Sequence, residues 1–475
     1  MGDRSVTRNC GPDLARVGAG LPVAAYRDEI TTALHGGRAV IVAPPGTGKT
    51  TFVPPLVASR CSGRVIVTQP RRVAARAAAR RLAALTGTRP GEFASHTVHG
   101  ESTTTRDTKV EFVTTGVLLR RLLSDPDLTG VDAVVLDEVH ERHLDADLVV
   151  AMVCEVAQLR DDLTIVAMSA TVDSSGWAAF LGGVEPAPVV EVASALHELE
   201  VEWAPAAGAA VESRGVSREF LGHLGTVTVD ALDRHTEGSA LVFVPGAREV
   251  DHVVADLRSR LAGIDVVGLS GAMSAREQDH ALSDPGNVRR VIVSTAVAES
   301  SLTVPGVRLV VDSGLSREPR LDRGRGMTGL VTVRESRASA VQRAGRAARL
   351  GPGVAVRCLR AQDWAGMNAD PTPEVDHADL VASLLSLAVW GSPRGEGMAL
   401  PTPLPQDRVA AAEEELRDLG AVDAEGRITV RGRHLATFPL DPRLARALTD
   451  GAAIVGSRRC AEIAAMLGLE DGQVD

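Results

Sequence analysis

The sequence predicts an α/β protein with two tandem parallel-sheet units, followed by a small winged-helix unit and the start of a helical bundle. Three observations support this fold class. Short runs of Val, Ile and Leu alternate with longer helical patterns from about Arg38 to Leu359. The alternation lapses once, between about Glu185 and Thr226, in a stretch rich in Pro, Gly, Ala and Ser. After Leu359 the pattern changes to a proline-bearing turn and further helices.

The apolar runs have the character of strands that are buried on both faces. They are rich in β-branched residues and show little polar alternation, which is typical of a parallel sheet with helices on each side. The first five runs are RAVIVAP, RVIVTQP, VEFVTT, DAVVLDE and LTIVAMSAT, and the second five are SALVFVPG, IDVVGLS, RRVIVST, VRLVVDSG and GVAVRCL. The lapse between the two groups therefore marks the junction of two α/β units.

The sequence after the second group predicts smaller units. NADPTPEVDH indicates a turn and ADLVASLLSLAVWG an apolar helix. Residues 407–442 then read as helix, glycine break, short strand, turn and short strand, an order that suggests a winged helix. The remainder, from about Arg443, is expected to be helical. The predicted boundaries are 1–190 and 191–365 for the α/β units, 366–440 for the winged helix and 441–475 for the helical start.

Composition restricts the class of protein. The net charge of -10 and the pI near 5.7 argue against a wholly basic nucleic-acid coat protein, although arginines cluster locally. The five cysteines are scattered without a C-x-x-C pair, so neither a disulfide framework nor a structural zinc site is suggested. The N-terminus lacks a signal-peptide layout, and no apolar run approaches the roughly 20 residues that span a bilayer. We expect a cytoplasmic protein without a membrane partner.

The stretch VIVAPPGTGKTT (Val40–Thr51) has the pattern of a loop that binds the phosphates of ATP. Its glycines let backbone N–H groups converge, and the helix expected from about Lys49 adds its positive dipole end. Lys49 would reach the β- and γ-phosphates, and the Thr50 hydroxyl would bind Mg²⁺. Ala43 replaces the usual first glycine and fits if its φ is negative. The expected nucleotide-binding residues are Gly46, Thr47, Gly48, Lys49, Thr50 and Thr51.

Lys49 argues for this interpretation by its rarity. Lys49 and Lys109 are the only lysines in the chain, and nearly every other positive charge is an arginine. A compact ammonium suits a phosphate cradle, whereas a turn that spells Gly-Lys-Thr by chance has no reason to contain one.

AVVLDEVHER predicts the acidic half of the same site. Asp137 and Glu138 follow an apolar run, where Asp137 would hold Mg²⁺ and Glu138 would orient and deprotonate the attacking water. His140 is expected to couple the nucleotide to the next motif. The alternative for this stretch alone is a solvated acidic strand end, which the phosphate loop disfavours.

Seven motifs occur in one order along the chain: APPGTGKT, TQPRR, TTG, DEVH, SAT, STAVAESSLT and QRAGRAAR. In this order and spacing the chain resembles superfamily 2 helicases, more specifically the DEAH-box group and its bacterial HrpB-type members, from roughly Leu21 to Leu469. The resemblance implies two RecA-like domains with ATP in the cleft between them. It also implies an ATP-dependent helicase or translocase that acts on single-stranded or partly duplex RNA, with no obligate protein partner inferred.

The resemblance assigns roles to individual residues. Ser169 and Thr171 are expected to bridge the nucleotide site to strand movement, and Arg81 to stack on adenine. The residues expected to act on the hydrolytic water and the γ-phosphate are Gln342, Arg346 and Arg349. A solvated basic helix face is the alternative for RAGRAAR in isolation.

The expected nucleic-acid track consists of hydroxyls and arginines, which suit phosphate and ribose without reading sequence. Its candidates are Arg71, Arg72, Thr114, Thr115 and Thr295. Aromatic residues make up only 3% of the chain, so backbone contacts are expected to outweigh base stacking. Residues 317–336 resemble a β-hairpin with a basic loop, which in the family acts as a wedge at the strand junction; a plain surface hairpin is the alternative.

Some positions depart from the family pattern. Ala296 stands where the family commonly has asparagine, and Ala348 where it commonly has glycine. HrpB-type proteins also continue beyond a position equivalent to the end of this chain. Two alternatives to an RNA helicase therefore stay open: a DNA-directed translocase, and a nucleotide-gated nucleic-acid-binding scaffold that does not turn over.

Overall fold

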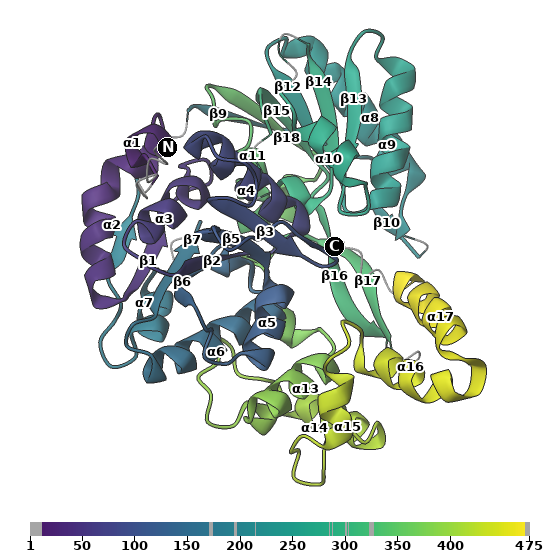
Figure 1. Ribbon diagram of the computed structural model, residues 1–475. Coiled ribbons are helices and arrows are strands. Elements are labelled where there is room, and N and C mark those ends of the chain that lie inside the picture. Colours follow the sequence, from purple (N-terminus) through teal and green to yellow (C-terminus); the bar gives the residue numbers. More distant parts are fainter. Residues whose placement is uncertain are drawn as a thin grey trace, which may run out of the picture. The chain divides into compact units, whose positions relative to one another are not determined.

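The computed structural model describes residues 12–170, 174–193, 197–213, 215–284, 286, 288–299, 302, 304–322 and 327–470 (Figure 1). Its internal contacts divide the chain into two compact units, which we describe separately. Unit 1 comprises residues 1–118, 127–138 and 156–194, and unit 2 comprises residues 119–126, 139–155 and 195–475.

Unit 1 is built on an eight-stranded sheet with the order β4-β3-β5-β2-β6-β7-β1-β8. The strands are β1 (Arg38–Val42), β2 (Arg64–Gln69), β3 (Ala94–Val98), β4 (Glu101–Ser102), β5 (Val110–Thr114), β6 (Val131–Leu136), β7 (Thr164–Ser169) and β8 (Val189–Glu191). Every neighbouring pair is parallel except β3 with β4. The first five predicted runs correspond to β1, β2, β5, β6 and β7, so the predicted parallel sheet is confirmed.

Helices flank this sheet, and several of them begin at the carboxyl end of a strand. They are α1 (Leu14–Gly18), α2 (Arg27–Ala33), α3 (Lys49–Ala58), α4 (Arg72–Thr86) and α7 (Ser174–Gly182). Helices α5 (Thr115–Ser124) and α6 (Leu144–Leu159) are divided between the two units. Side chains such as Ile41, Val67 and Phe112 are completely buried in the core. The apolar runs were recognisable for this reason, because a central parallel strand buries both of its faces.

Unit 2 contains a second parallel sheet, of six strands, with the order β13-β14-β12-β15-β18-β9. Its strands are β9 (Leu199–Trp203), β12 (Ser239–Phe243), β13 (Asp265–Leu269), β14 (Arg290–Ser294), β15 (Val307–Asp312) and β18 (Gly353–Arg357). The accompanying helices include α8 (Arg218–Arg234), α9 (Ala247–Arg260), α10 (Ala275–Leu282) and α11 (Arg337–Ala344). All five runs of the second predicted group are strands of this sheet.

The predicted hairpin is also present in unit 2. Strands β16 (Leu315–Asp322) and β17 (Met327–Arg334) pair in antiparallel register (Figure 1). The basic loop that the sequence suggested between them, residues 323–326, lies outside the described residues.

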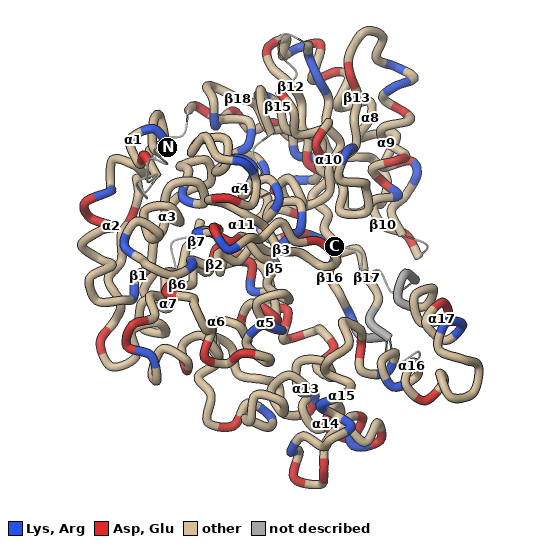
Figure 2. The backbone as a smooth tube through the Cα atoms, viewed as in Figure 1, with Lys and Arg blue, Asp and Glu red and all other residues tan. Residues whose placement is uncertain are grey.

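The C-terminal part of unit 2 is helical, with α13 (Val381–Trp390), α14 (Gln406–Asp418), α15 (Val430–Leu435), α16 (Pro442–Val455) and α17 (Ser457–Glu470). The two short strands expected after α14 are not formed: the described chain has a single antiparallel bridge there, between Val422 and Ile428. The second expected strand is wrong because Thr429 caps a helix, its hydroxyl accepting the Gly432 N–H at 2.9 Å. Acidic and basic residues are interspersed around α14 and α15 (Figure 2).

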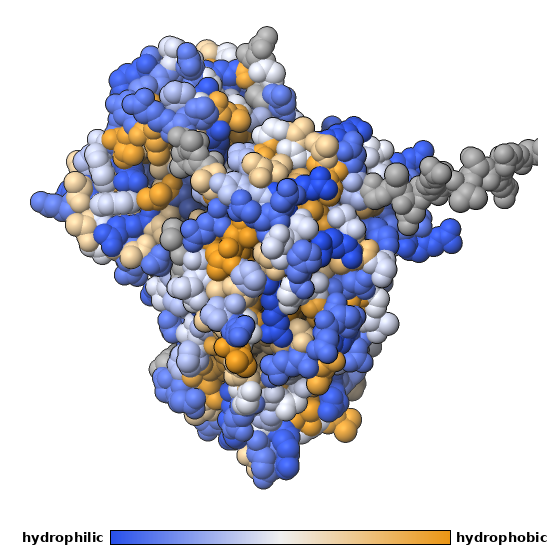
Figure 3. Space-filling view, turned by 90° about the vertical axis from the view of Figure 1, so that its left-hand side faces the viewer, coloured by the Kyte–Doolittle hydropathy of each residue, from blue (hydrophilic) through white to orange (hydrophobic). Residues whose placement is uncertain are grey.

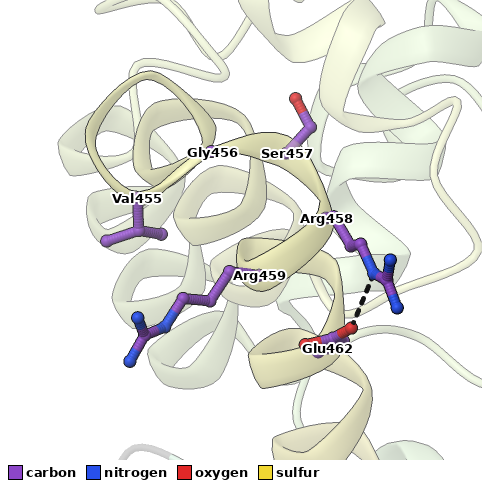
Figure 4. A pocket seen from close by; sticks show the side chains of 6 residues that line it. All are labelled: Val455, Gly456, Ser457, Arg458, Arg459 and Glu462. Carbon is purple, nitrogen blue, oxygen red and sulfur yellow. Dashed lines mark hydrogen bonds and ion pairs between the residues drawn. The ribbon is translucent and has the colours of Figure 1, made fainter.

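On the face seen in Figure 3, apolar side chains gather in small patches among hydrophilic ones. A hollow at the turn between α16 and α17 is lined by Val455, Gly456, Ser457, Arg458, Arg459 and Glu462 (Figure 4). Arg458 pairs with Glu462 at 3.1 Å, and none of the predicted site residues lines this hollow. No helix among the described residues is long and apolar enough to cross a membrane.

Candidate nucleotide and nucleic-acid site

The phosphate loop joins β1 to α3, as the sequence predicts. Gly46 and Gly48 have φ values of 91° and 86°, in the left-handed region that favours glycine. A Cβ atom on Gly48 would also lie 2.8 Å from the side chain of Leu21. Both the backbone conformation and the lack of space therefore require glycine at this position. Ala43 has a negative φ, which is the condition for alanine to replace glycine there. Helix α3 begins at Lys49, so its N-terminus faces the end of the loop.

The acidic residues after β6 lie against the start of α3. The Thr50 hydroxyl donates to Asp137 Oδ2 at 2.6 Å. Lys49 Nζ lies 3.1 Å from Glu138 Oε2, and both side chains are at most 5% exposed. The structure therefore brings together four residues that the sequence separates by almost ninety positions. A hydroxyl and a carboxylate in contact are oxygen ligands of the type that Mg²⁺ prefers, so this pair fits the cation.

The electrostatics of this cluster are unbalanced. Burial and the neighbouring Glu138 raise the pKa of Asp137 to about 7, against the lowering effects of Lys49, Thr50 and Gln69. Two buried carboxylates lie near a single ammonium, so the site attracts further positive charge. The cluster is therefore suited to a divalent cation.

Gln69 is a member of this cluster that the sequence reasoning missed. It ends β2, the strand next to β6, and its Nε2 donates to Asp137 Oδ2 at 2.7 Å. The Thr68 hydroxyl on the same strand accepts the Asp137 N–H at 3.1 Å. The sequence does contain a signal for Gln69: it is a polar residue at the carboxyl end of an apolar run, within the TQPRR motif and two positions before Arg71.

Four of the nucleic-acid candidates lie at the same edge of the sheet. Arg71 and Arg72 follow β2, whereas Thr114 ends β5 and Thr115 begins α5. Strands β2 and β5 are neighbours, with Gln69 paired to Thr114, so these side chains project beside one another at the carboxyl ends of the strands. All four are partly exposed. The carboxyl edge of a parallel sheet is where such folds bind ligands.

The remaining site residues predicted in the first α/β unit lie on several different elements. Arg81 is exposed on α4, and Ser169 ends β7, where its carbonyl accepts the Ala43 N–H at 3.0 Å. His140 is buried in the short 3₁₀ helix Val139–Glu141. Thr171 lies outside the described residues.

The predicted residues of unit 2 lie at the end of α11 and after β14. Gln342 is a partly exposed residue of α11, Thr295 follows β14, and Arg349 lies in the turns beyond α11. Arg346 is only 3% exposed; its Nε donates to the Glu299 carbonyl at 2.8 Å and its Nη1 to the Leu302 carbonyl. A solvated basic helix is therefore the wrong interpretation of RAGRAAR.

Comparisons with known proteins agree with this arrangement. Residues 26–177 match the family "DEAD/DEAH box helicase", residues 224–351 match "Helicase conserved C-terminal domain", and residues 412–440 match "Helicase associated domain (HA2), winged-helix". The chain belongs to the DEAD/DEAH box helicases. The first match contains both the phosphate loop and the acidic pair, and the second contains Arg346 and Arg349.

Relatives of this chain include the ATP-dependent RNA helicase HrpB of Escherichia coli, which is 37% identical over 454 residues, 94% of this chain and 54% of the relative. The probable ATP-dependent RNA helicase DHX34 of Homo sapiens is 33% identical over 92% of this chain and 39% of the relative. The crystal structure of the E. coli DEAH/RHA helicase HrpB superposes with a TM-score of 0.86 and 36% identity, covering 94% of this chain and 56% of that one. The helicase chain thus spans about half the length of the curated relatives it matches. The fold is that of two RecA-like domains with an HA2 winged helix and a helical C-terminus.

The chain also contains a largely buried ionic cluster that the sequence did not reveal. Arg343 of α11 is 1% exposed and pairs with three carboxylates: Glu299 at 2.8 Å, Asp312 at 3.1 Å, and Glu335. Burial raises the pKa of Glu335 well above its usual range, against the attraction of Arg343. Because Glu299 also accepts a hydrogen bond from Arg346 through its carbonyl, the Arg343 cluster and Arg346 share Glu299 as a partner.

Replacing Arg343 by Ala is expected to destabilise the chain by about 3–5 kcal/mol, because the buried Asp312 and Glu335 and the partly exposed Glu299 lose the one cation they share. Chemical denaturation of both chains measures this difference in the free energy of unfolding. The control is Arg427→Ala, which removes an exposed ion pair to Asp423 and is expected to leave the denaturation midpoint nearly unchanged. An equal shift for both variants would contradict the proposed importance of the cluster.

Proposed function

We propose that this chain is an ATP-dependent RNA helicase or translocase that hydrolyses Mg-ATP and moves along a single strand. The main support is a pair of contacts: Lys49 with Glu138, and Thr50 with Asp137. They bring the lysine proposed to bind phosphate next to the carboxylate proposed to activate water. The names and the fold of the relatives support the choice of RNA and of strand movement.

In this proposal the residues of the phosphate loop bind the triphosphate. The backbone of residues 46–48 and the N-terminus of α3 surround the phosphates, and Lys49 exchanges its contact with Glu138 for the β- and γ-phosphates. Thr50 and Asp137 would hold Mg²⁺, which neutralises phosphate charge when bound. Glu138, released from Lys49, orients the attacking water and accepts its proton.

Gln342, Arg346 and Arg349 complete the proposed hydrolytic machinery. Gln342 would help to place the water, and the two arginines would stabilise the charge that develops on the transferred phosphoryl group. Arg346 has two backbone carbonyl partners in the described structure, so its guanidinium is already oriented before it acts. This preorganisation supports a role in the transition state, where a mobile side chain would lose entropy.

The nucleic-acid strand is proposed to follow the edge that carries Arg71, Arg72, Thr114 and Thr115, with Thr295 contributing from unit 2. These side chains offer charge and hydroxyl groups and no aromatic platform, so they suit a phosphate backbone. Because β2 separates β5 from β6, this track lies one strand away from Asp137. A shift of β2 would therefore displace residues of both the nucleotide site and the nucleic-acid track.

The proposal is tested by steady-state ATP hydrolysis with and without matched single strands of RNA and DNA. Stimulation by RNA is the expected result, and it should weaken as salt is raised because phosphate contacts dominate. Stronger stimulation by DNA would instead indicate a DNA-directed translocase. Nucleotide-dependent strand binding without any single-turnover hydrolysis would indicate a non-hydrolysing scaffold.

A further inference from the structure

The chain leaves the nucleotide site through a strained turn. Glu138 and Arg142 have φ values of 55° and 56°, in the left-handed region that residues with a Cβ atom rarely adopt. Between them lies the 3₁₀ turn Val139–Glu141, and helix α6 begins at Leu144. Left-handed residues persist only where their surroundings hold them, so the contacts of this turn determine how firmly the backbone after Glu138 is fixed.

A distant glutamate holds the end of this turn. The backbone N–H of Glu374 donates to the Arg142 carbonyl at 3.1 Å, and its carboxylate accepts the Leu144 N–H at 2.8 Å. The same carboxylate lies 3.4 Å from His143 Nδ1. Glu374 therefore binds three successive residues, 142 to 144, through its main chain and its side chain. Burial opposes ionisation, but the His143 and Leu144 contacts outweigh it and lower the pKa of Glu374.

The Leu144 contact is the equivalent of a helix cap supplied from another segment. The first N–H groups of a helix have no partner within it, and a carboxylate at this end also interacts favourably with the helix dipole. No residue immediately before α6 is needed for this role, because Glu374, 230 positions away, performs it. The start of α6 is therefore fixed by the segment that precedes α13.

Two further contacts tie the same regions together. The Arg142 guanidinium donates to Asp147 at 3.0 and 3.3 Å and also reaches the Thr402 hydroxyl. Near the end of α6, Trp390 Nε1 donates to the Glu155 carboxylate at 2.6 Å. All of these residues belong to unit 2, whereas Glu138 is the last residue of its segment in unit 1. The chain thus passes from one unit to the other between Glu138 and Val139.

We propose that Glu374 is a positioning residue for ATP hydrolysis. By holding residues 142–144 it fixes the far end of the strained turn, and through three intervening residues it fixes the backbone of Glu138. Since Glu138 must present its carboxylate to the water with ångström accuracy, a loosened turn would slow the chemical step without weakening nucleotide binding. This inference rests on the proposed function.

The test compares three variants with the unaltered chain. Glu374→Ala is expected to lower kcat about 10- to 100-fold, because a misplaced catalytic group loses rate steeply with distance. The KM for ATP and the Kd of an unhydrolysable analogue should change less than about threefold, since the phosphate loop is untouched. Glu374→Gln, whose amide oxygen can still accept the Leu144 N–H, should recover most of the rate. Asp376→Ala, an exposed carboxylate in the same 3₁₀ turn, is the matched control and should behave as the unaltered chain.

Two readouts separate this inference from general damage and from failure of the proposed function. In a Glu138→Gln background, Glu374→Ala should cause no further loss of the residual rate, because it acts through Glu138; a multiplicative loss would overturn the inference. Hydrogen exchange needs no hydrolysis: the Leu144 amide should exchange faster in Glu374→Ala, and unchanged exchange would also overturn it. If the unaltered chain hydrolyses no ATP, the proposed function fails, and hydrogen exchange still decides whether Glu374 holds the turn.

Discussion

ATP hydrolysis by the Glu138→Gln variant is expected to be at least about 100-fold slower than by the unaltered chain, because the amide cannot accept the proton of the attacking water. Nucleotide binding should persist or tighten. Lys49 Nζ lies 3.1 Å from the Glu138 carboxylate, so an incoming phosphate must compete with that carboxylate for the ammonium. Single-turnover hydrolysis, together with equilibrium binding of an unhydrolysable analogue, measures both effects.

A matched control for this variant is Glu111→Gln. Glu111 is a buried carboxylate of β5 in the same sheet and pairs with Arg64 at 3.0 Å, so it tests the general cost of neutralising a buried acid. Its hydrolysis rate is expected to match that of the unaltered chain. Normal hydrolysis by Glu138→Gln would show that another group activates the water.

The second large effect is expected for Arg346→Ala. Removing an arginine that stabilises the transferred phosphoryl group costs about 10³-fold or more in kcat. Lys at this position should restore little, because an ammonium cannot maintain the forked contacts to the Glu299 and Leu302 carbonyls while also facing a phosphate. The measurement is kcat at saturating ATP and RNA, with folding checked by thermal denaturation.

Arg337→Ala provides the comparison within the same helix, since Arg337 is a partly exposed arginine at the start of α11. It should retain full activity. If Arg346→Ala hydrolysed ATP at the normal rate, the Arg346 guanidinium would have only the structural role of binding the Glu299 and Leu302 carbonyls.

The sequence was sufficient to predict those elements whose structure is encoded by neighbouring residues in the chain. Fully buried parallel strands read as unbroken apolar runs, and the phosphate loop combines strand, glycine turn and helix within twelve residues. The edge strands β4, β8 and β9 were not expected, because little burial means little apolar signal. Strand β3 is interior and largely buried, but its sequence ASHTV is too polar to read as an apolar run. Helix α15 was mistaken for a strand because three β-branched residues, Ile428, Thr429 and Val430, lead into it. The Thr429 side chain instead caps the helix, which begins at Val430.

The parts of the candidate site that depend on distant residues could not be predicted. Gln69 joins Asp137 only because β2 and β6 are adjacent in the sheet. Arg343 draws its partners from three separate segments, and its motif letters give no sign that this arginine is more deeply buried than Arg349. Glu374 lies in a stretch that reads simply as a turn. Each of these contacts is created by tertiary packing, which periodicity and spacing do not encode.

The most direct measurement of the central claim is the affinity of the chain for an unhydrolysable Mg-ATP analogue before and after Lys49→Ala. The account predicts a loss of at least about tenfold, since the ammonium makes a charge-assisted contact that no neighbouring group can replace. An unchanged dissociation constant would mean that the triphosphate binds elsewhere, and the roles given to Thr50, Asp137 and Glu138 would fall with it.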